Sequence, residues 1–125
     1  MEFQNGIPIY IQVIRSLQEQ IMTGAIKPGD KLPSSRELAM TYQINPKTAA
    51  RVLKEMDSIG ITTTKRGIGT FITYDADKLD KMRQEYAERL IEEFADKMQR
   101  IGCSPKQLPS LLEDYFRERG NYDET

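Results

Sequence analysis

Apolar residues recur with helical spacing along most of the chain. The first helix is predicted by five residues at i, i+3, i+4, i+7 and i+11, namely Tyr10, Val13, Ile14, Leu17 and Ile21. Pro8 precedes this pattern and Gly24 follows it, as is typical of the two ends of a helix. Residues 1–8 look like a loose arm in front of the helix.

Two short helices joined by a tight turn are predicted next. Ser34 and Glu37 fit a capping box, in which each side chain accepts a hydrogen bond from the other's backbone N–H. That helix is expected to end near residues 42–43. Asn45 and Pro46 suit the N-cap and first residue of the following helix. Its buried stripe is predicted to be Ala49, Val52, Leu53 and Met56, so the pair forms a helix-turn-helix.

The hydrophobic period changes after Gly60. Residues 61–64 and 69–74 are rich in β-branched and aromatic side chains, which favours two strands. Residues 65–68 lie between the two strands and include a glycine. They are expected to form the turn of a β-hairpin with a basic tip. Residues 31–33 are too few for more than a bridge-like strand. Three helices followed by a hairpin predict a winged helix-turn-helix.

The remaining chain is predicted to be helical again. Asp75 or Asp77 can cap a long helix that runs to about Ile101, and a last helix starts near Pro109. Apolar residues at helical spacing in this part are Leu79, Met82, Tyr86, Leu90, Phe94, Met98, Leu108, Leu111, Leu112, Tyr115 and Phe116. The expected fold is mainly α with a small β-hairpin. A winged helix-turn-helix over residues 1–75 is followed by a two-helix C-terminal dimerisation tail over residues 76–125.

The tail's apolar residues have two interpretations. They either cover the winged helix as additional core or pair with a second copy of the chain. The stripe on the long helix drifts by about 40° with each i+4 step, because successive helical residues are about 100° apart. Its apolar residues therefore spread over roughly half the circumference, more than one small domain can easily cover. This favours a homodimer interface.

Composition and charge restrict the possible functions. The 125 residues contain no histidine and one cysteine, which excludes histidine general bases, Ser-His and Cys-His pairs and an internal disulfide. We therefore expect that the protein is not an enzyme and has no cofactor or metal site. The single cysteine favours a location in the reducing cytoplasm. The chain contains no run of about 18 apolar residues, so we expect no membrane-spanning helix. The net charge of −1 divides into +3 for residues 1–74 and −4 for residues 75–125, which suggests two roles.

The third predicted helix carries a basic face. Lys47, Ala50, Arg51 and Lys54 lie opposite its buried stripe, and Lys47 and Thr48 lie at its N-terminal end. A DNA major groove admits one helix, whose N-terminal side chains reach base edges. Arg36, near the start of the second helix, is placed to meet a phosphate together with the N–H groups of that helix. The expected DNA-binding residues are Arg36, Lys47, Thr48, Arg51, Lys54, Lys65, Arg66 and Gly67, the last three at the hairpin tip.

Four segments together resemble the GntR-type regulators. They are Pro8-Ile9-Tyr10-Ile11-Gln12, the run from Gly24 to Ala39 with Pro28-Gly29-Asp30-Lys31-Leu32-Pro33, the Asn45–Val52 segment, and Lys65-Arg66-Gly67 followed by Gly69-Thr70-Phe71. The Asn-Pro entry to the third helix and the short two-helix tail resemble the YtrA-like subgroup of this family.

The resemblance implies a dimeric transcription regulator that binds double-stranded DNA. Such proteins are usually repressors, and in this subgroup the target is often an operon for an ABC-type transporter. Arg36, Lys47, Thr48, Arg66 and Gly67 match the family's DNA-contact positions, whereas many members have arginine where this chain has Pro46 and Ala50. Larger members carry an effector domain after the wing; about 50 residues follow it here, and the effector is unknown.

Two other classes of function remain as alternatives. A protein-interaction adaptor would use the basic hairpin and third helix to bind an acidic partner. An enzyme is the weakest alternative, because the chain offers neither histidine nor a paired catalytic cysteine. The regulator is favoured because the polarity of the third helix fits entry into a DNA groove.

Overall fold

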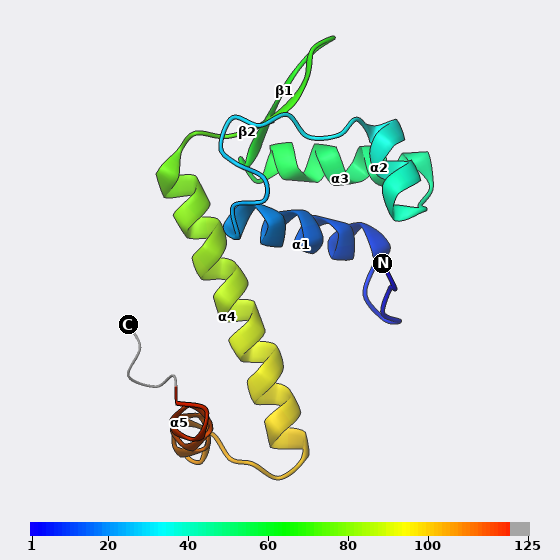
Figure 1. The fold of residues 1–125 in the computed structure, drawn as a ribbon. Helices are drawn as coiled ribbons and strands as arrows, with labels where there is room; N and C mark the ends of the chain where they lie inside the picture. Colours follow the sequence, from blue (N-terminus) through cyan, green and yellow to red (C-terminus); the bar gives the residue numbers. More distant parts are fainter. Residues whose placement is uncertain (121–125) are drawn as a thin grey trace. The chain divides into compact units, whose positions relative to one another are not determined.

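The computed structural model describes residues 1–120. This part of the chain forms five α-helices and one two-stranded sheet (Figure 1). In chain order they are α1 (Ile9–Met22), α2 (Ser35–Tyr42), α3 (Pro46–Ser58), β1 (Thr62–Lys65), β2 (Gly69–Ile72), α4 (Ala76–Arg100) and α5 (Leu108–Glu118). The predicted fold class, mainly helical with a small hairpin, is confirmed.

The described residues fold as two compact units, which divide between Arg83 and Gln84. The boundary between them falls within α4, so the first two turns of that helix belong to the first unit. The last five residues of the expected tail, 121–125, lie outside the described residues. Among residues 1–120, no helix combines the length and the apolar character needed to cross a membrane.

The core of the first unit lies where α1, α2 and α3 meet. Leu38, Val52 and Met56 are at most 1% exposed, and Val13 of α1 is completely buried. Figure 1 shows α1 and α3 side by side with the hairpin beyond them. Burying one such side chain contributes about 1.5–3 kcal/mol, so this cluster fixes the orientation of α3. The buried stripe predicted for α3 is confirmed at Ala49, Val52 and Met56, with Leu53 packed at its edge.

The hairpin is held by α3 at β1 and by the segment before α2 at β2. β1 and β2 are antiparallel, with Thr62 opposite Ile72 and Lys65 opposite Gly69. Lys31 forms the expected isolated bridge, with Phe71 as its partner. The buried Thr62 hydroxyl donates a hydrogen bond to the Asp57 carboxylate near the end of α3. These contacts position the wing relative to α3.

The N-terminal arm is attached to α1, contrary to the expectation of a loose segment. The Gln12 side chain accepts a hydrogen bond from the Gln4 backbone N–H at 2.8 Å. Its Nε2 donates to the carbonyl oxygens of Gln4 at 2.9 Å and Ile7 at 2.8 Å. Phe3 also packs against the core cluster. A buried amide that bonds to backbone groups in this way orders a segment that has no periodic pattern of its own.

The turn between α2 and α3 depends on a left-handed residue. Gln43 follows the last residue of α2 and has φ 54° and ψ 52°. This is the single non-glycine residue with positive φ among those described. The Ile44 N–H donates to the Ala39 carbonyl oxygen at 3.0 Å, which completes the end of α2. A side chain in this conformation costs about 1 kcal/mol relative to glycine, because its Cβ crowds the backbone.

We predict that Gln43→Gly stabilises the protein. The substitution removes the left-handed strain, and the free energy of unfolding should rise by up to about 1 kcal/mol despite the greater freedom of glycine in the unfolded chain. Urea denaturation of the full chain measures this change. Gln43→Ala is the matched control and should bring no gain, because alanine keeps the Cβ. A loss of stability in the glycine variant would contradict the role assigned to the strain.

Candidate nucleic-acid interface

The beginning of α2 is capped as the sequence predicts. The Glu37 N–H donates to Ser34 Oγ at 3.1 Å, and the Ser34 N–H donates to Glu37 Oε1 at 3.0 Å. Hydrogen bonding of the Glu37 carboxyl to the Ser34 backbone, and next to the Ser34 side chain, lowers the pKa of Glu37, and the charge of Lys31 acts in the same direction. Arg36 is exposed in this first turn, beside backbone N–H groups that favour an anion. The geometry is compatible with a phosphate contact by Arg36.

The basic face of α3 is directed to solvent. Asn45 caps the helix by accepting a hydrogen bond from the Lys47 N–H at 2.8 Å, and Pro46 is its first residue. Lys47, Ala50 and Lys54 are exposed, whereas Thr48 is half-buried. This arrangement leaves the N-terminal turn of α3 and one small side chain accessible to a groove.

Arg51 makes contacts that the sequence reasoning missed. Its guanidinium carbon lies 3.7 Å from the centre of the Tyr10 ring on α1, a cation–π contact. Its Nε is also 4.0 Å from the Glu55 carboxylate on the next turn. The side chain remains 56% exposed. The spacing of apolar residues places Tyr10 only in the stripe that faces the core. It does not reveal that α1 and α3 bring Tyr10 and Arg51 together.

The hairpin tip presents a second basic group. Lys65, Arg66 and Gly67 are all exposed, and Gly67 has φ 77°, which a glycine adopts without strain. The Lys65 Nζ lies 5.4 Å from the centre of the Phe71 ring. Ile68 is 61% exposed beside them, an apolar tip residue that the sequence reasoning did not single out. The tip therefore offers cations and a small residue to a polyanion.

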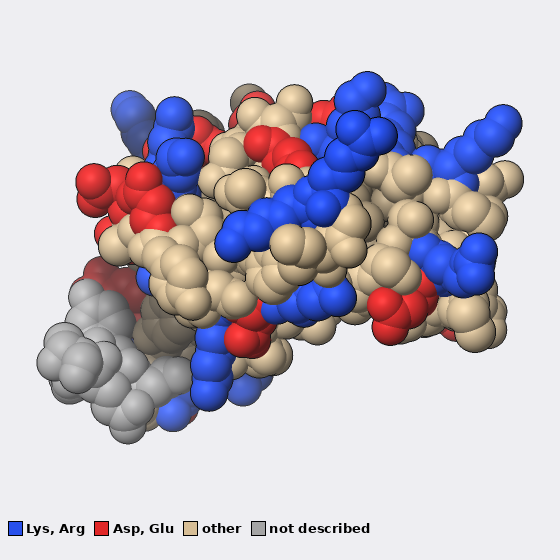
Figure 2. Space-filling view, turned by 90° about the horizontal axis from the view of Figure 1, so that it is seen from above, with Lys and Arg blue, Asp and Glu red and all other residues tan. Residues whose placement is uncertain are grey.

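Lys and Arg side chains project at several places across the face seen from above in Figure 2, with carboxylates in smaller patches between them. Residues 27–66 contain eight Lys or Arg and four Asp or Glu, a local charge of +4. Positive potential on such a surface attracts nucleic acid independently of sequence. Within residues 1–120, no group of three or more Cys, Asp or Glu side chains is arranged to hold a metal ion.

The apolar residues predicted for the tail interface divide into three groups by their burial. Met82 is 5% exposed inside the core of the first unit, and Leu79 packs against that core. Tyr86 is also buried, with the Arg89 guanidinium carbon 4.8 Å from its ring centre. Farther along, Met98 and Leu108 are half-buried. The exposed members are Leu90, Phe94, Leu111, Leu112, Tyr115 and Phe116. Of the predicted interface residues, only those from Leu90 onward are therefore exposed or half-buried outside the core of the first unit.

Comparison with known proteins identifies one family over the first unit. The model for bacterial regulatory proteins of the gntR family matches residues 9–72. The uncharacterized HTH-type transcriptional regulator YhcF of Bacillus subtilis is 35% identical over 107 residues, covering 86% of this chain and 88% of YhcF. The HTH-type transcriptional repressor YtrA of Bacillus subtilis is 45% identical over 73 residues, covering 58% of this chain and 56% of YtrA.

Solved structures agree with this assignment. A GntR family transcriptional regulator from Listeria monocytogenes superposes with a TM-score of 0.78 at 31% identity, covering 90% of this chain and 98% of that one. The DNA-binding domain of AraR in complex with operator ORX1 superposes with a TM-score of 0.54 at 27% identity, covering 58% of this chain and 93% of that one.

The family match covers α1, α2, α3 and the whole hairpin, the elements that carry the basic residues described above. The similarity to YhcF extends beyond them into the tail. The chain thus belongs to the gntR family of bacterial regulatory proteins, as a YtrA-like, DNA-binding transcription regulator and not an enzyme.

Proposed function

We propose that this protein is a repressor that binds an inverted-repeat operator as a homodimer. The observation that carries the proposal is the exposed basic face of α3, whose capped N-terminal end lies free of the core. Support also comes from relatives named as repressors, including YtrA, and from the AraR domain, whose structure contains operator DNA. Residues 1–75 act as the DNA-binding domain and residues 76–125 as the dimerisation tail.

In this proposal α3 enters the major groove. Lys47, Thr48 and Arg51 meet base edges or adjacent phosphates, and Lys54 contacts the backbone farther along the helix. Arg36 binds a phosphate from the start of α2. Lys65, Arg66 and Gly67 meet the backbone or minor groove from the wing. Each assignment uses a side chain or glycine that is accessible, with only Thr48 half-buried.

The tail supplies the second half-site. Helix α5 has a strongly one-sided apolar pattern, yet none of its residues is buried. Tyr115 and Phe116 contact each other edge to face, with ring centres 5.3 Å apart, and both rings are at least 40% exposed. Apolar surface of this kind favours association. A second copy is the occupant we propose, because two linked domains supply the affinity that one small domain lacks.

The regulated genes and the location of the protein follow from the same proposal. Resemblance to the YtrA-like subgroup supports control of an operon for an ABC-type transporter. A repressor of bacterial genes acts in the cytoplasm, where its single cysteine, Cys103, stays reduced. No cofactor is required for the proposed binding.

The operator itself provides the first test. Duplexes selected from a random pool by the full-length protein should contain an inverted repeat, because a two-fold symmetric dimer presents two copies of α3. Footprinting should show two protected regions on one face of the duplex. Enrichment of a lone half-site would contradict the dimeric arrangement. Failure to bind any duplex at low salt would favour the adaptor alternative.

Arg51→Ala should weaken binding to the selected operator by about 1–3 kcal/mol and relax its sequence preference. Tyr10→Leu removes the ring beneath the guanidinium but keeps the charge, so its effect should be smaller. Fluorescence anisotropy with operator and random duplexes separates the possibilities. Arg100→Ala, which removes a cation from the end of α4, is the control. A loss no greater than in this control would exclude Arg51 from the interface, and an equal loss on random DNA would make it a phosphate contact.

Lys65→Ala should weaken binding to all sequences alike. Removing one phosphate contact lowers the slope of log affinity against log salt concentration by about one unit, because one fewer counterion is released. Titrations at several salt concentrations measure the slope. Lys106→Ala removes an equal charge from the tail and should leave the slope unchanged. An unaltered slope in the Lys65 variant would remove this residue from the DNA surface.

Phe94→Asp combined with Leu112→Asp should separate the dimer. The two carboxylates would lie unpaired in an apolar interface, where their burial is unfavourable. Sedimentation should then show a monomer, while circular dichroism retains most of the helical signal because the first unit has its own core. Affinity for the full operator should fall by about two orders of magnitude or more, since the half-sites bind independently.

A matched pair of charges provides the control for the dimer variant. Gln99→Asp with Ser110→Asp adds the same charge to exposed positions on the opposite sides of α4 and α5. This control should remain dimeric and bind the operator normally. A dimeric Phe94→Asp, Leu112→Asp variant, or a wild-type monomer at micromolar concentration, would show that the tail is not the dimerisation module.

A further inference from the structure

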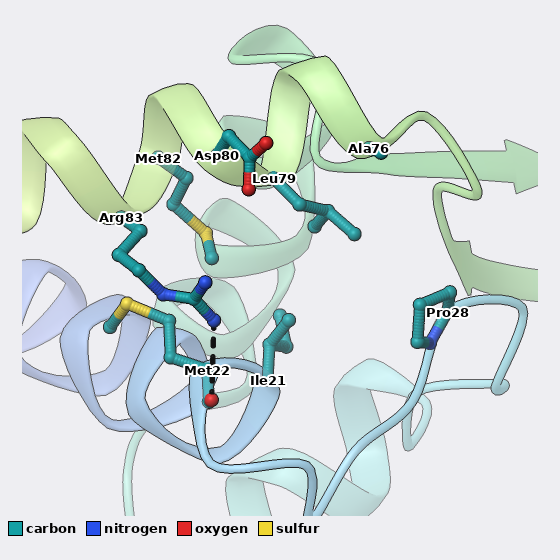
Figure 3. A pocket seen from close by; sticks show the side chains of 8 residues that line it. All are labelled: Ile21, Met22, Pro28, Ala76, Leu79, Asp80, Met82 and Arg83. Atoms are coloured by element: carbon teal, nitrogen blue, oxygen red, sulfur yellow. Dashed lines mark hydrogen bonds between the residues drawn. The ribbon is translucent and has the colours of Figure 1, made fainter. Parts of the chain in front are cut away.

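A cavity of about 270 Å³ lies within the first unit, apart from the proposed DNA-binding residues. It is partly open to solvent and is lined by the last turn of α1, the Pro28 turn and the first two turns of α4 (Figure 3). Its walls are mostly apolar and include Ile21, Met22, Leu79 and Met82. The two methionines are unbranched and adaptable, so the cavity can adjust to the shape of a ligand.

Arg83 provides the cationic group of this cavity. In Figure 3 its side chain crosses from α4 toward α1, and its Nη2 donates to the Met22 carbonyl oxygen at 3.4 Å. That hydrogen bond is longer than the usual 2.7–3.2 Å, so it is weak. A guanidinium has five N–H donors, and among residues 1–120 no carboxylate forms an ion pair with Arg83. Most of its donors therefore remain available to an anion.

Asp80 restricts which anion fits. It is exposed and contributes to the lining one helical turn before Arg83. Its negative charge opposes a dianion such as phosphate but is compatible with a single carboxylate held by the guanidinium. The volume is slightly below the usual range for drug-sized ligands, so the ligand has on the order of a dozen non-hydrogen atoms.

We propose that this cavity binds a small monocarboxylate with an apolar body. The carboxylate pairs with Arg83, in the two-pronged geometry that guanidinium favours, and the apolar body lies between Leu79, Met82 and the end of α1. This site goes beyond the DNA-binding function proposed above. Its occupancy is measured without DNA, so failure of either proposal leaves the other intact.

Methionine methyl NMR tests the proposal directly. The full chain, labelled with ¹³C at its methionine methyl groups, is titrated with 4-phenylbutanoate as the probe. The methyl signals of Met22 and Met82 should shift together and saturate at roughly millimolar probe, as expected for so small a ligand. The signal of Met40, which is 75% exposed on α2, should not move. Equal shifts at Met40, or none at Met22 and Met82, would overturn the proposal.

Matched probes and variants test the role of the carboxylate. The alcohol 4-phenylbutan-1-ol and the amine 4-phenylbutylamine should bind at least fivefold more weakly. Arg83→Gln should weaken 4-phenylbutanoate binding by roughly fivefold to tenfold, the effect of losing a charge-assisted hydrogen bond at a solvent-accessible site. Lys97→Gln, which removes an equal charge later in α4, should have no effect. Equal binding of the amine, or an unaffected Arg83→Gln variant, would contradict the assigned ligand class.

A blocking variant gives a second, independent readout. Ala76 lines the cavity from the exposed first turn of α4, so Ala76→Leu occupies the space without disturbing the buried core. This variant should keep its fold by circular dichroism and show no saturable shift at Met22 or Met82. Undiminished binding of 4-phenylbutanoate by the blocked variant would place the ligand elsewhere.

Discussion

The packing of α3 against α1 and α2 is the constraint on which the rest of the structure depends. Ala49, Val52 and Met56 are completely buried along one side of α3. Lys47, Ala50 and Lys54 lie on the opposite side of the helix. Burial of the apolar side therefore directs them to solvent. The hydrophobic core thus determines which side chains can meet DNA. Asp57 and Thr62 then connect the end of the same helix to the wing.

Local signals made much of this fold predictable from sequence. The capping box of Ser34 and Glu37 and the Asn45-Pro46 entry to α3 lie within a few residues of the helix ends they determine. Asp75 likewise accepts hydrogen bonds from the N–H groups of Asp77 and Lys78 at the start of α4. Such interactions are encoded in short motifs, so the order and approximate bounds of the helices follow from the chain alone.

Contacts between distant segments were not predictable in the same way. The arm is ordered through the Gln12 side chain, and Arg51 stacks on Tyr10, 41 residues earlier in the chain. Gln43 adopts a left-handed conformation although nothing in its residue type requires it. Met82 shares its helical stripe with Phe94, yet only Met82 is enclosed by the core of the first unit. Periodicity identifies an apolar face, whereas tertiary packing decides which part of that face is covered.

We propose that the solvent-facing side of α3 and the hairpin tip form the DNA-binding surface. Backbone amide NMR of the full chain, titrated with the selected operator duplex, tests this claim most directly. The largest chemical-shift changes should occur at Lys47, Thr48, Ala50 and Gly67. Changes concentrated on α5 or on the end of α1, with those four amides unmoved, would contradict it.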